Sequence, residues 1–175
     1  METLPRLFTR ENLLDIRVAK NFLDLFLVAK DILSRMPKDL YQVCGPISNG
    51  DLGSRSKNII VFEKTIDAFQ EIGFSVFNQV AFEETMWRLT YEYSDKSMAT
   101  LDYIHCLEEF YLPLFKTGKI KHLLFIPGWQ SSTRSNWERK KAEEFGINVY
   151  DLPENWVDHY DPNLFKELFP TIKHF

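Results

Sequence analysis

The sequence predicts an α/β domain built on a parallel sheet, preceded by a helical extension. Short apolar runs alternate along the chain with longer segments of helical periodicity. Those helical segments are long enough to carry the crossover between two parallel strands. The run at residues 120–126 is apolar almost throughout, which is typical of a strand covered on both faces.

The predicted strands are short, and turn-forming residues follow them. We expect strands at residues 40–44, 74–77, 120–126 and 147–150. Gly45-Pro46 follows the first and Pro127-Gly128 the third. Apolar periodicity predicts helices at residues 58–72, 99–115, 131–145 and 162–168, whereas residues 80–97 show no periodicity that favours either element.

Residues 10–36 carry apolar side chains at helical spacing, between Thr9 as a candidate N-cap and Pro37 as a terminator. They predict a long helix with room for one break, so we divide the chain into an extension at 1–37 and an α/β domain at 38–175. Apolar residues crowd nearly the full circumference around residues 22–27. We therefore expect a homo-oligomer with this helix near the interface; the alternative is packing on its own domain beneath the tail that contains Trp156.

Composition excludes several classes of protein. The 175 residues are 45% hydrophobic and 26% charged, as in globular domains, and the net charge of −4 gives no general attraction for polymeric nucleic acid. Cys44 and Cys106 form neither a CxxC motif nor a Cys/His cluster, so we expect no disulfide framework, metal or other cofactor. The N-terminus lacks the basic region of a signal peptide, and no apolar run is long enough to span a bilayer. The expectation is a cytoplasmic protein that does not bind membranes.

Candidate binding residues follow the first predicted strand, because ligands of parallel sheets bind beyond the carboxyl ends of the strands. Gly45, Pro46 and Ser48 lie in this loop, and Arg55 and Lys57 precede the next helix. Glycine allows close approach of the backbone, and helix N-terminal amides favour an anion. A solvated loop with a basic pair explains these residues equally well.

Carboxylates supply the candidate chemistry. Glu138 lies in the first turns of the helix after the third strand, where it is either a functional carboxylate or the capping-box partner of Ser135. Glu108 and Glu109 lie on the middle predicted helix, where an exposed acidic face is the alternative explanation.

Residues 40–150 together resemble the nucleoside 2-deoxyribosyltransferase-like superfamily, which includes 2′-deoxynucleoside 5′-phosphate N-hydrolases and related, often phage-borne proteins. The resemblance lies in Cys44-Gly45-Pro46-Ile47, in residues 73–78, and in residues 127–132 followed by 137–142 and 146–149. It implies a Rossmann-like or flavodoxin-like sheet with helices on both faces. It also implies an enzyme that cleaves an N-glycosidic bond or transfers a deoxyribosyl group, with a nucleoside or nucleotide as its small-molecule partner.

The resemblance also implies roles for particular residues. Glu138 takes the place of the nucleophile, Glu108 that of a catalytic aspartate, and Ser132 that of a phosphate-binding serine. The other substrate-binding positions are Gly45, Pro46, Ser48, Arg55, Asn78 and Trp129. A 5′-monophosphate is favoured because Ser48, Arg55, Lys57 and Ser132 would surround an anion.

Several positions depart from the family pattern. Gln42 stands where the family has a tyrosine, Ser48 where the hydrolases have an arginine, and Arg134 where relatives often have glycine. These departures keep two alternatives open. One is a non-catalytic nucleotide-binding or sensing module of the same fold. The other is a protein that acts only through contacts of its N-terminal helix.

Overall fold

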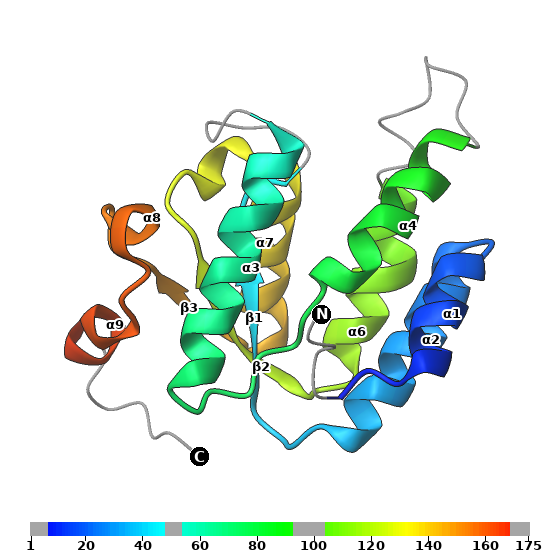
Figure 1. The fold of residues 1–175 in the computed structure, drawn as a ribbon, viewed down its shortest axis with the longest axis horizontal. Helices are drawn as coiled ribbons and strands as arrows, with labels where there is room; N and C mark the ends of the chain where they lie inside the picture. Colours follow the sequence, from blue (N-terminus) through cyan, green and yellow to red (C-terminus); the bar gives the residue numbers. More distant parts are fainter. Residues whose placement is uncertain (1–6, 48–53, 93–103, 169–175) are drawn as a thin grey trace. The chain divides into compact units, whose positions relative to one another are not determined.

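The computed structural model describes residues 7–47, 54–92 and 104–168, and the chain divides into two compact units (Figure 1). The helical unit comprises Met1–Lys38 and Asn78–Lys119, and the sheet unit comprises Asp39–Phe77 and Ile120–Phe175. The expected boundary after residue 37 falls beside the first division. The expected α/β domain at 38–175 is nevertheless interrupted, because residues 78–119 pack with the N-terminal helices.

The sheet unit confirms the prediction of an α/β fold with a parallel sheet. Its strands are β1 (Leu40–Cys44), β2 (Ile120–Phe125) and β3 (Asn148–Asp151), all parallel and in that spatial order. In this register Leu124 of β2 pairs with both Val43 and Tyr150.

The strand predicted at residues 74–77 is reduced to one parallel bridge between Val76 and Tyr41. Tyr41 donates its amide to the Ser75 carbonyl at 2.9 Å and accepts from the Phe77 amide at 2.8 Å. The chain then turns at Asn78, whose side chain accepts from the Val80 amide at the start of the next helix. Pairing therefore stops after a single residue of β1.

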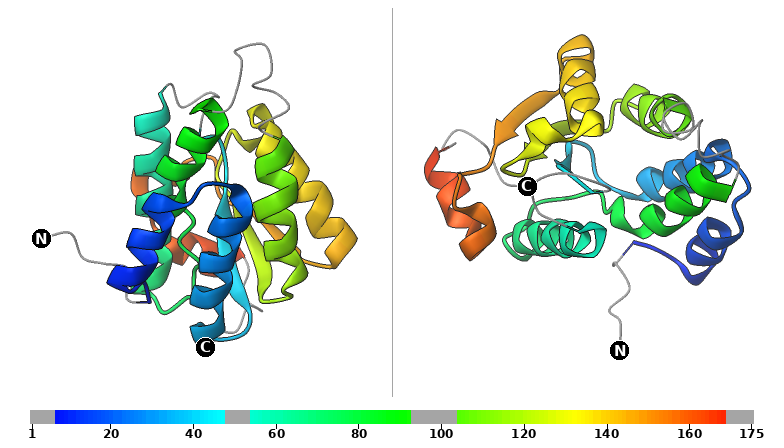
Figure 2. Two further views of the ribbon diagram at one scale, coloured as in Figure 1. Left: turned by 90° about the vertical axis from the view of Figure 1, so that its right-hand side faces the viewer. Right: turned by 90° about the horizontal axis from the view of Figure 1, so that it is seen from above.

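Helices cover both faces of this sheet. Helix α3 (Arg55–Glu71) lies on one face and α7 (Thr133–Phe145) on the other (Figure 1, Figure 2). A short 3₁₀ turn, η2 (Trp129–Ser131), precedes α7. The side chain of Ser132 caps α7 by accepting from the Ser135 amide at 3.2 Å, and Gly146 ends it in the left-handed conformation.

The C-terminal segment completes the aromatic core of the sheet unit. It forms α8 (Trp156–His159), which the sequence analysis did not predict, and α9 (Pro162–Leu168), which it did. Trp156 is fully buried, stacks on Phe69 with ring centroids 5.2 Å apart, and donates to Thr65 Oγ1 at 2.9 Å. A buried indole with its N–H paired anchors α8 on α3.

The helical unit contains α1 (Arg10–Val18), α2 (Phe22–Arg35), α4 (Val80–Glu92) and a helical stretch at 104–116. That stretch includes the π-helical turn η1 (Leu107–Tyr111) and α6 (Leu112–Lys116). The π turn ends two residues before Pro113, which has no amide hydrogen to continue an α-helical pattern. The long helix predicted at 10–36 is broken, because Asn21 caps α2 by accepting from the Asp24 amide at 2.8 Å.

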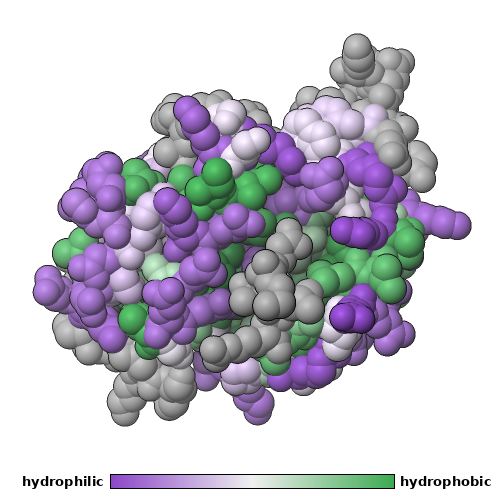
Figure 3. All heavy atoms as spheres, viewed as in Figure 1, coloured by the Kyte–Doolittle hydropathy of each residue, from purple (hydrophilic) through white to green (hydrophobic). Residues whose placement is uncertain are grey.

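Part of the apolar surface of the N-terminal helices is exposed. Phe22 and Leu25 of α2 are buried, whereas Leu23 and Leu27 remain 55% and 54% exposed. Leu14 and Val18 of α1 are exposed as well, and Figure 3 shows apolar atoms at the surface of the molecule. None of the described helices has the length and hydropathy needed to cross a bilayer.

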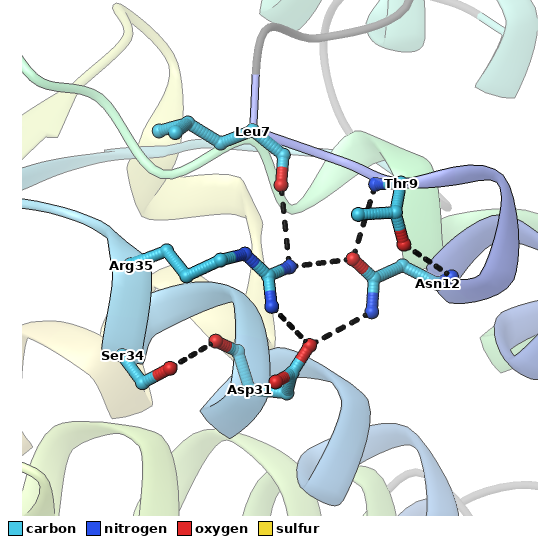
Figure 4. Close-up of polar contacts among 6 residues, drawn as sticks. All are labelled: Leu7, Thr9, Asn12, Asp31, Ser34 and Arg35. Atoms are coloured by element: carbon cyan, nitrogen blue, oxygen red, sulfur yellow. Dashed lines mark hydrogen bonds and ion pairs between the residues drawn. The ribbon is translucent and has the colours of Figure 1, made fainter.

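A polar network joins α1 to α2 (Figure 4). Asn12 and Thr9 form a capping box, and the Asn12 side chain also donates to Asp31 Oδ2 at 3.0 Å. Arg35 donates to Asn12 Oδ1 at 2.6 Å and pairs with Asp31. The hydrogen bonds that Asp31 accepts lower the pKa of its carboxyl group, and the bond from Arg35 has a larger effect than the bond from Asn12. The end of the helical pair opposite the connecting residues 19–21 is therefore held by side chains as well as by apolar packing.

Candidate functional site

Glu138 lies on the face of α7 that packs against the sheet. The buried residues of this helix are Arg134, Ser135, Glu138 and Ala142. Glu138 is 1% exposed and Gln42 of β1 is fully buried, and the Gln42 Nε2 amide donates to Glu138 Oε1 at 3.0 Å. This bond joins the middle of the first strand to a helix 96 residues further along the chain.

The capping-box interpretation of Glu138 is wrong. Ser132, not Ser135, is the N-cap of α7, so Glu138 falls in the second turn rather than at the third helical position. A capping carboxylate reaches back to the free amide of the N-cap residue. Glu138 instead accepts a hydrogen bond from another element, the adjacent strand.

The topology of the sheet places this pair at a point where two crossovers diverge. The chain leaves β1 toward α3 on one face, and it leaves β2 toward α7 on the other (Figure 2). Such a divergence opens a crevice at the carboxyl ends of the two strands, which is where α/β sheets bind ligands. Gly45 lies at this edge, and a Cβ atom there would come within 3.2 Å of Ile126 Cβ and 3.3 Å of Phe62. Glycine thus permits close packing of the loop after β1.

Cys44 forms part of the same buried cluster, two residues after Gln42. Burial raises the pKa of its thiol well above the ordinary value, and the charge and hydrogen bonding of Glu138 raise it further. Arg134 and Gln42 act in the opposite direction. The Cys44 thiol is therefore protonated and is not a candidate nucleophile. Because the charges of Glu138 and Arg134 both shift the pKa of Cys44, both side chains lie near this last residue of β1.

Several buried polar atoms of the sheet unit have no hydrogen-bond partner among residues 7–47, 54–92 and 104–168, among them Gln42 Oε1, Asn58 Oδ1 and Ser135 Oγ. Asn58 lies in α3 and donates its side-chain amide to the Ile47 carbonyl at 2.8 Å, in the loop that follows β1. Buried polar atoms are normally satisfied in native proteins, so these atoms are places where a ligand would form hydrogen bonds.

Most of the predicted binding residues belong to the same unit as Glu138. Gly45 and Pro46 are buried directly after β1, and Arg55 is the first residue of α3. Ser132 is the buried cap of α7. Ser48 lies outside the described residues.

Trp129 follows β2 and forms part of a cation–π stack. The Arg139 guanidinium lies 4.4 Å from the centroid of the Trp129 ring and 4.8 Å from that of Phe125. Arg139 also makes two hydrogen bonds to Asp151, at 2.7 and 2.9 Å. The position of Trp129 is thus fixed by α7 and by the end of β3.

Two predicted site residues belong to the helical unit. Asn78 accepts from the Val80 amide at 3.1 Å and so begins α4. Glu108 is exposed on the π turn, beside the ion pair that Glu109 forms with His105. The exposed acidic face named as the alternative for Glu108 describes its position, and its part in catalysis stays a prediction.

The buried residues around Glu138 were not predicted from the sequence to be ligand-binding residues. Gln42 and Arg134 were noted as departures from a pattern, whereas Asn58 and Ser135 were not considered as ligands. A polar residue in the middle of the apolar run Leu40–Cys44 was the available signal, because a buried strand admits such a residue only with a partner. Among the described residues no group of three His, Cys, Asp or Glu side chains is arranged to hold a metal ion.

Comparison with known proteins identifies no relative: no family model matches the chain, and neither curated proteins nor solved structures show a significant match.

Proposed function

We propose that the protein cleaves the N-glycosidic bond of nucleosides or nucleotides, or transfers their sugar, with Glu138 as the nucleophile. The observation that carries this proposal is a buried carboxylate held by an amide donor, Gln42, beneath the two paired strands whose crossovers leave on opposite faces of the sheet. The spatial order of residues 74–77, β1, β2 and β3 supports a flavodoxin-like member of the Rossmann-like folds. The resemblance of residues 127–149 to the nucleophile region supports the same assignment.

The proposed reaction has two displacements at the anomeric carbon of the sugar. A carboxylate oxygen of Glu138 forms a bond to C1′ while the C1′–N bond breaks, and the electron pair leaves with the base, which takes a proton from solvent. A water oxygen, or the nitrogen of an acceptor base, then attacks C1′ and displaces the carboxylate. Its proton passes to solvent. The hydrogen bond from Gln42 orients the Glu138 carboxylate, which is the attacking group in the first step and the leaving group in the second.

A 5′-monophosphate remains the favoured substrate. The N-termini of α3 and α7 both lie at the carboxyl edge of the sheet, where their free amides attract an anion. Arg55 opens α3 with Lys57 two residues later, and Ser132 caps α7. A phosphate at this edge would receive both charged and neutral hydrogen-bond donors.

The test measures, by chromatography, the free base released from a panel of nucleosides and their 5′-monophosphates. We expect the wild type to release base and Glu138→Gln to be slower by about a thousandfold or more, because the nucleophile is lost. Glu143→Gln changes an exposed carboxylate on the same helix and should keep the wild-type rate. Full activity of Glu138→Gln would remove the assignment.

The second candidate is a nucleotide-binding or sensing module without catalysis, and Arg134 favours it. This buried guanidinium lies one helical turn before Glu138, and its charge acts on the neighbouring Cys44 thiol. A cation there would oppose the positive charge that develops on the sugar in the transition state. Calorimetric binding of a nucleotide with no release of base would select this candidate.

We also propose that the helical unit mediates self-association. Leu14, Val18, Leu23 and Leu27 are each more than half exposed on α1 and α2, and burying such side chains stabilises association by several kcal/mol before its costs, at about 25 cal/mol per Å². Light scattering should give an oligomer for the wild type and a smaller species for Leu23→Glu/Leu27→Glu. Wild-type protein that is monomeric at micromolar concentration would contradict the proposal.

A further inference from the structure

The nitrogen and the oxygen of the Gln42 side-chain amide differ in their hydrogen bonding. Its Nε2 donates to Glu138 Oε1 at 3.0 Å, whereas its Oε1 is buried without a hydrogen bond from any residue of the described ranges. A carboxylate oxygen accepts and does not donate, so the nitrogen of Gln42 must face Glu138. The oxygen is thereby directed away from Glu138 and is a buried acceptor without a hydrogen-bond donor among the described residues.

Covalent geometry limits where this acceptor lies. The oxygen and nitrogen of one amide are separated by about 2.3 Å, given C=O and C–N bonds of about 1.23 and 1.33 Å. Because Nε2 is 3.0 Å from Glu138 Oε1, the free Gln42 oxygen lies within roughly 5 Å of that carboxylate oxygen. A substrate whose reacting carbon is attacked by Glu138 must place its adjacent groups within reach of Gln42.

Stereochemistry identifies the group that fits. In a β-nucleoside the attacking carboxylate approaches C1′ from the face opposite the base. The 2′-hydroxyl of ribose projects from that same face, on the carbon next to C1′. A 2′-deoxy sugar has no hydroxyl there, and an arabino sugar carries it on the face of the base. Of these three sugars, only ribose presents a donor beside the nucleophile on the side that Gln42 occupies.

We propose that Gln42 is a specificity residue whose Oε1 accepts a hydrogen bond from the substrate 2′-hydroxyl, so that the protein prefers ribosides to 2′-deoxyribosides. The inference rests on the proposed function, in which Glu138 attacks C1′. It reverses the sugar preference that the sequence resemblance implies. Asn58 Oδ1 and Ser135 Oγ are two further buried atoms of the sheet unit that accept hydrogen bonds and lack them from described residues, which suits a ligand rich in hydroxyl groups.

The test compares kcat/KM of the wild type for ribo-, 2′-deoxyribo- and arabinonucleoside 5′-monophosphates that carry the same base. We expect the ribo substrate to exceed both others by about ten- to a hundredfold, the usual cost of leaving a buried acceptor unpaired. In Gln42→Met, which keeps the length of the side chain but removes the acceptor, the ratio should fall to about one. Gln130→Met changes an exposed glutamine in the same unit and should leave the ratio unchanged.

The outcomes separate this inference from the proposed function. Cleavage that requires Glu138 but proceeds equally well or better with the 2′-deoxy substrate overturns the role of Gln42 and leaves the function standing. A ribo preference that persists in Gln42→Met also overturns that role. No cleavage of any of the three substrates by the wild type overturns both.

Discussion

Neighbouring residues of β1 place their side chains in different environments of the sheet unit. Gln42 points toward α7 and holds Glu138. Tyr41, the residue before it, lies 4.2 Å from the His122 ring in a parallel stack and meets Phe74 edge-on. His122 in turn lies 3.2 Å from the Tyr150 hydroxyl through Nδ1. Side chains on opposite faces of one strand thus form the buried Gln42–Glu138 pair on one side and an aromatic core on the other.

We predict a pH-dependent stability that originates at His122. Burial lowers the pKa of this imidazole below its ordinary value of 6.5, with Lys121 acting in the same direction and Asp39 against it. The unfolded chain therefore takes up the proton first, so the stability contributed above pH 6.5 is lost as the pH falls through the lowered pKa. His122→Phe keeps an aromatic ring and cannot titrate.

The measurement is the melting temperature of wild type and His122→Phe between pH 8 and pH 5. The melting temperature of the variant should rise relative to that of the wild type as the pH falls below 6.5. Parallel curves for the two proteins over this range would show that His122 does not contribute to the pH dependence.

At the scale of helices and strands, the sequence predicted those elements whose apolar pattern is regular. Residues 40–44 and 120–125 are strands in which all or most side chains are buried, and residues 133–145 form a helix between a serine cap and Gly146. Helix α4 was not predicted, because its buried face includes polar groups. Thr85 donates to the Ile16 carbonyl at 2.9 Å, and Glu83 accepts from the Tyr111 hydroxyl at 3.3 Å. Such partners are distant in sequence, so periodicity does not reveal them.

The polar network between α1 and α2 gives a prediction at this scale. Asn12 completes the capping box of α1 and also binds Asp31 and Arg35 of α2, so Asn12→Ala removes a cap and the links between two helices. We expect it to lower the free energy of unfolding by about 2–3 kcal/mol. Asn21→Ala, which removes only the cap of α2, should cost about 1 kcal/mol. Urea denaturation measures both, and equal losses would mean that the links to α2 contribute nothing.

At the scale of the whole molecule, the division into units was not evident from the chain. The helices at residues 80–92 and 104–116 follow β1 and α3 in sequence but contact the N-terminal helices α1 and α2. The candidate site was predicted in part. Glu138 was found by resemblance, whereas its partner Gln42 was not, since the two residues are 96 positions apart and only the folded sheet brings them together.

The most direct test of Glu138 as the nucleophile is mass spectrometry of the acid-quenched protein after a single turnover of a 5′-mononucleotide. We predict that wild-type protein gains the mass of the sugar phosphate, that digestion places the adduct on the peptide containing Glu138, and that Glu138→Gln shows none. An adduct on a different residue, or base release by Glu138→Gln at the wild-type rate, would show that Glu138 is not the nucleophile.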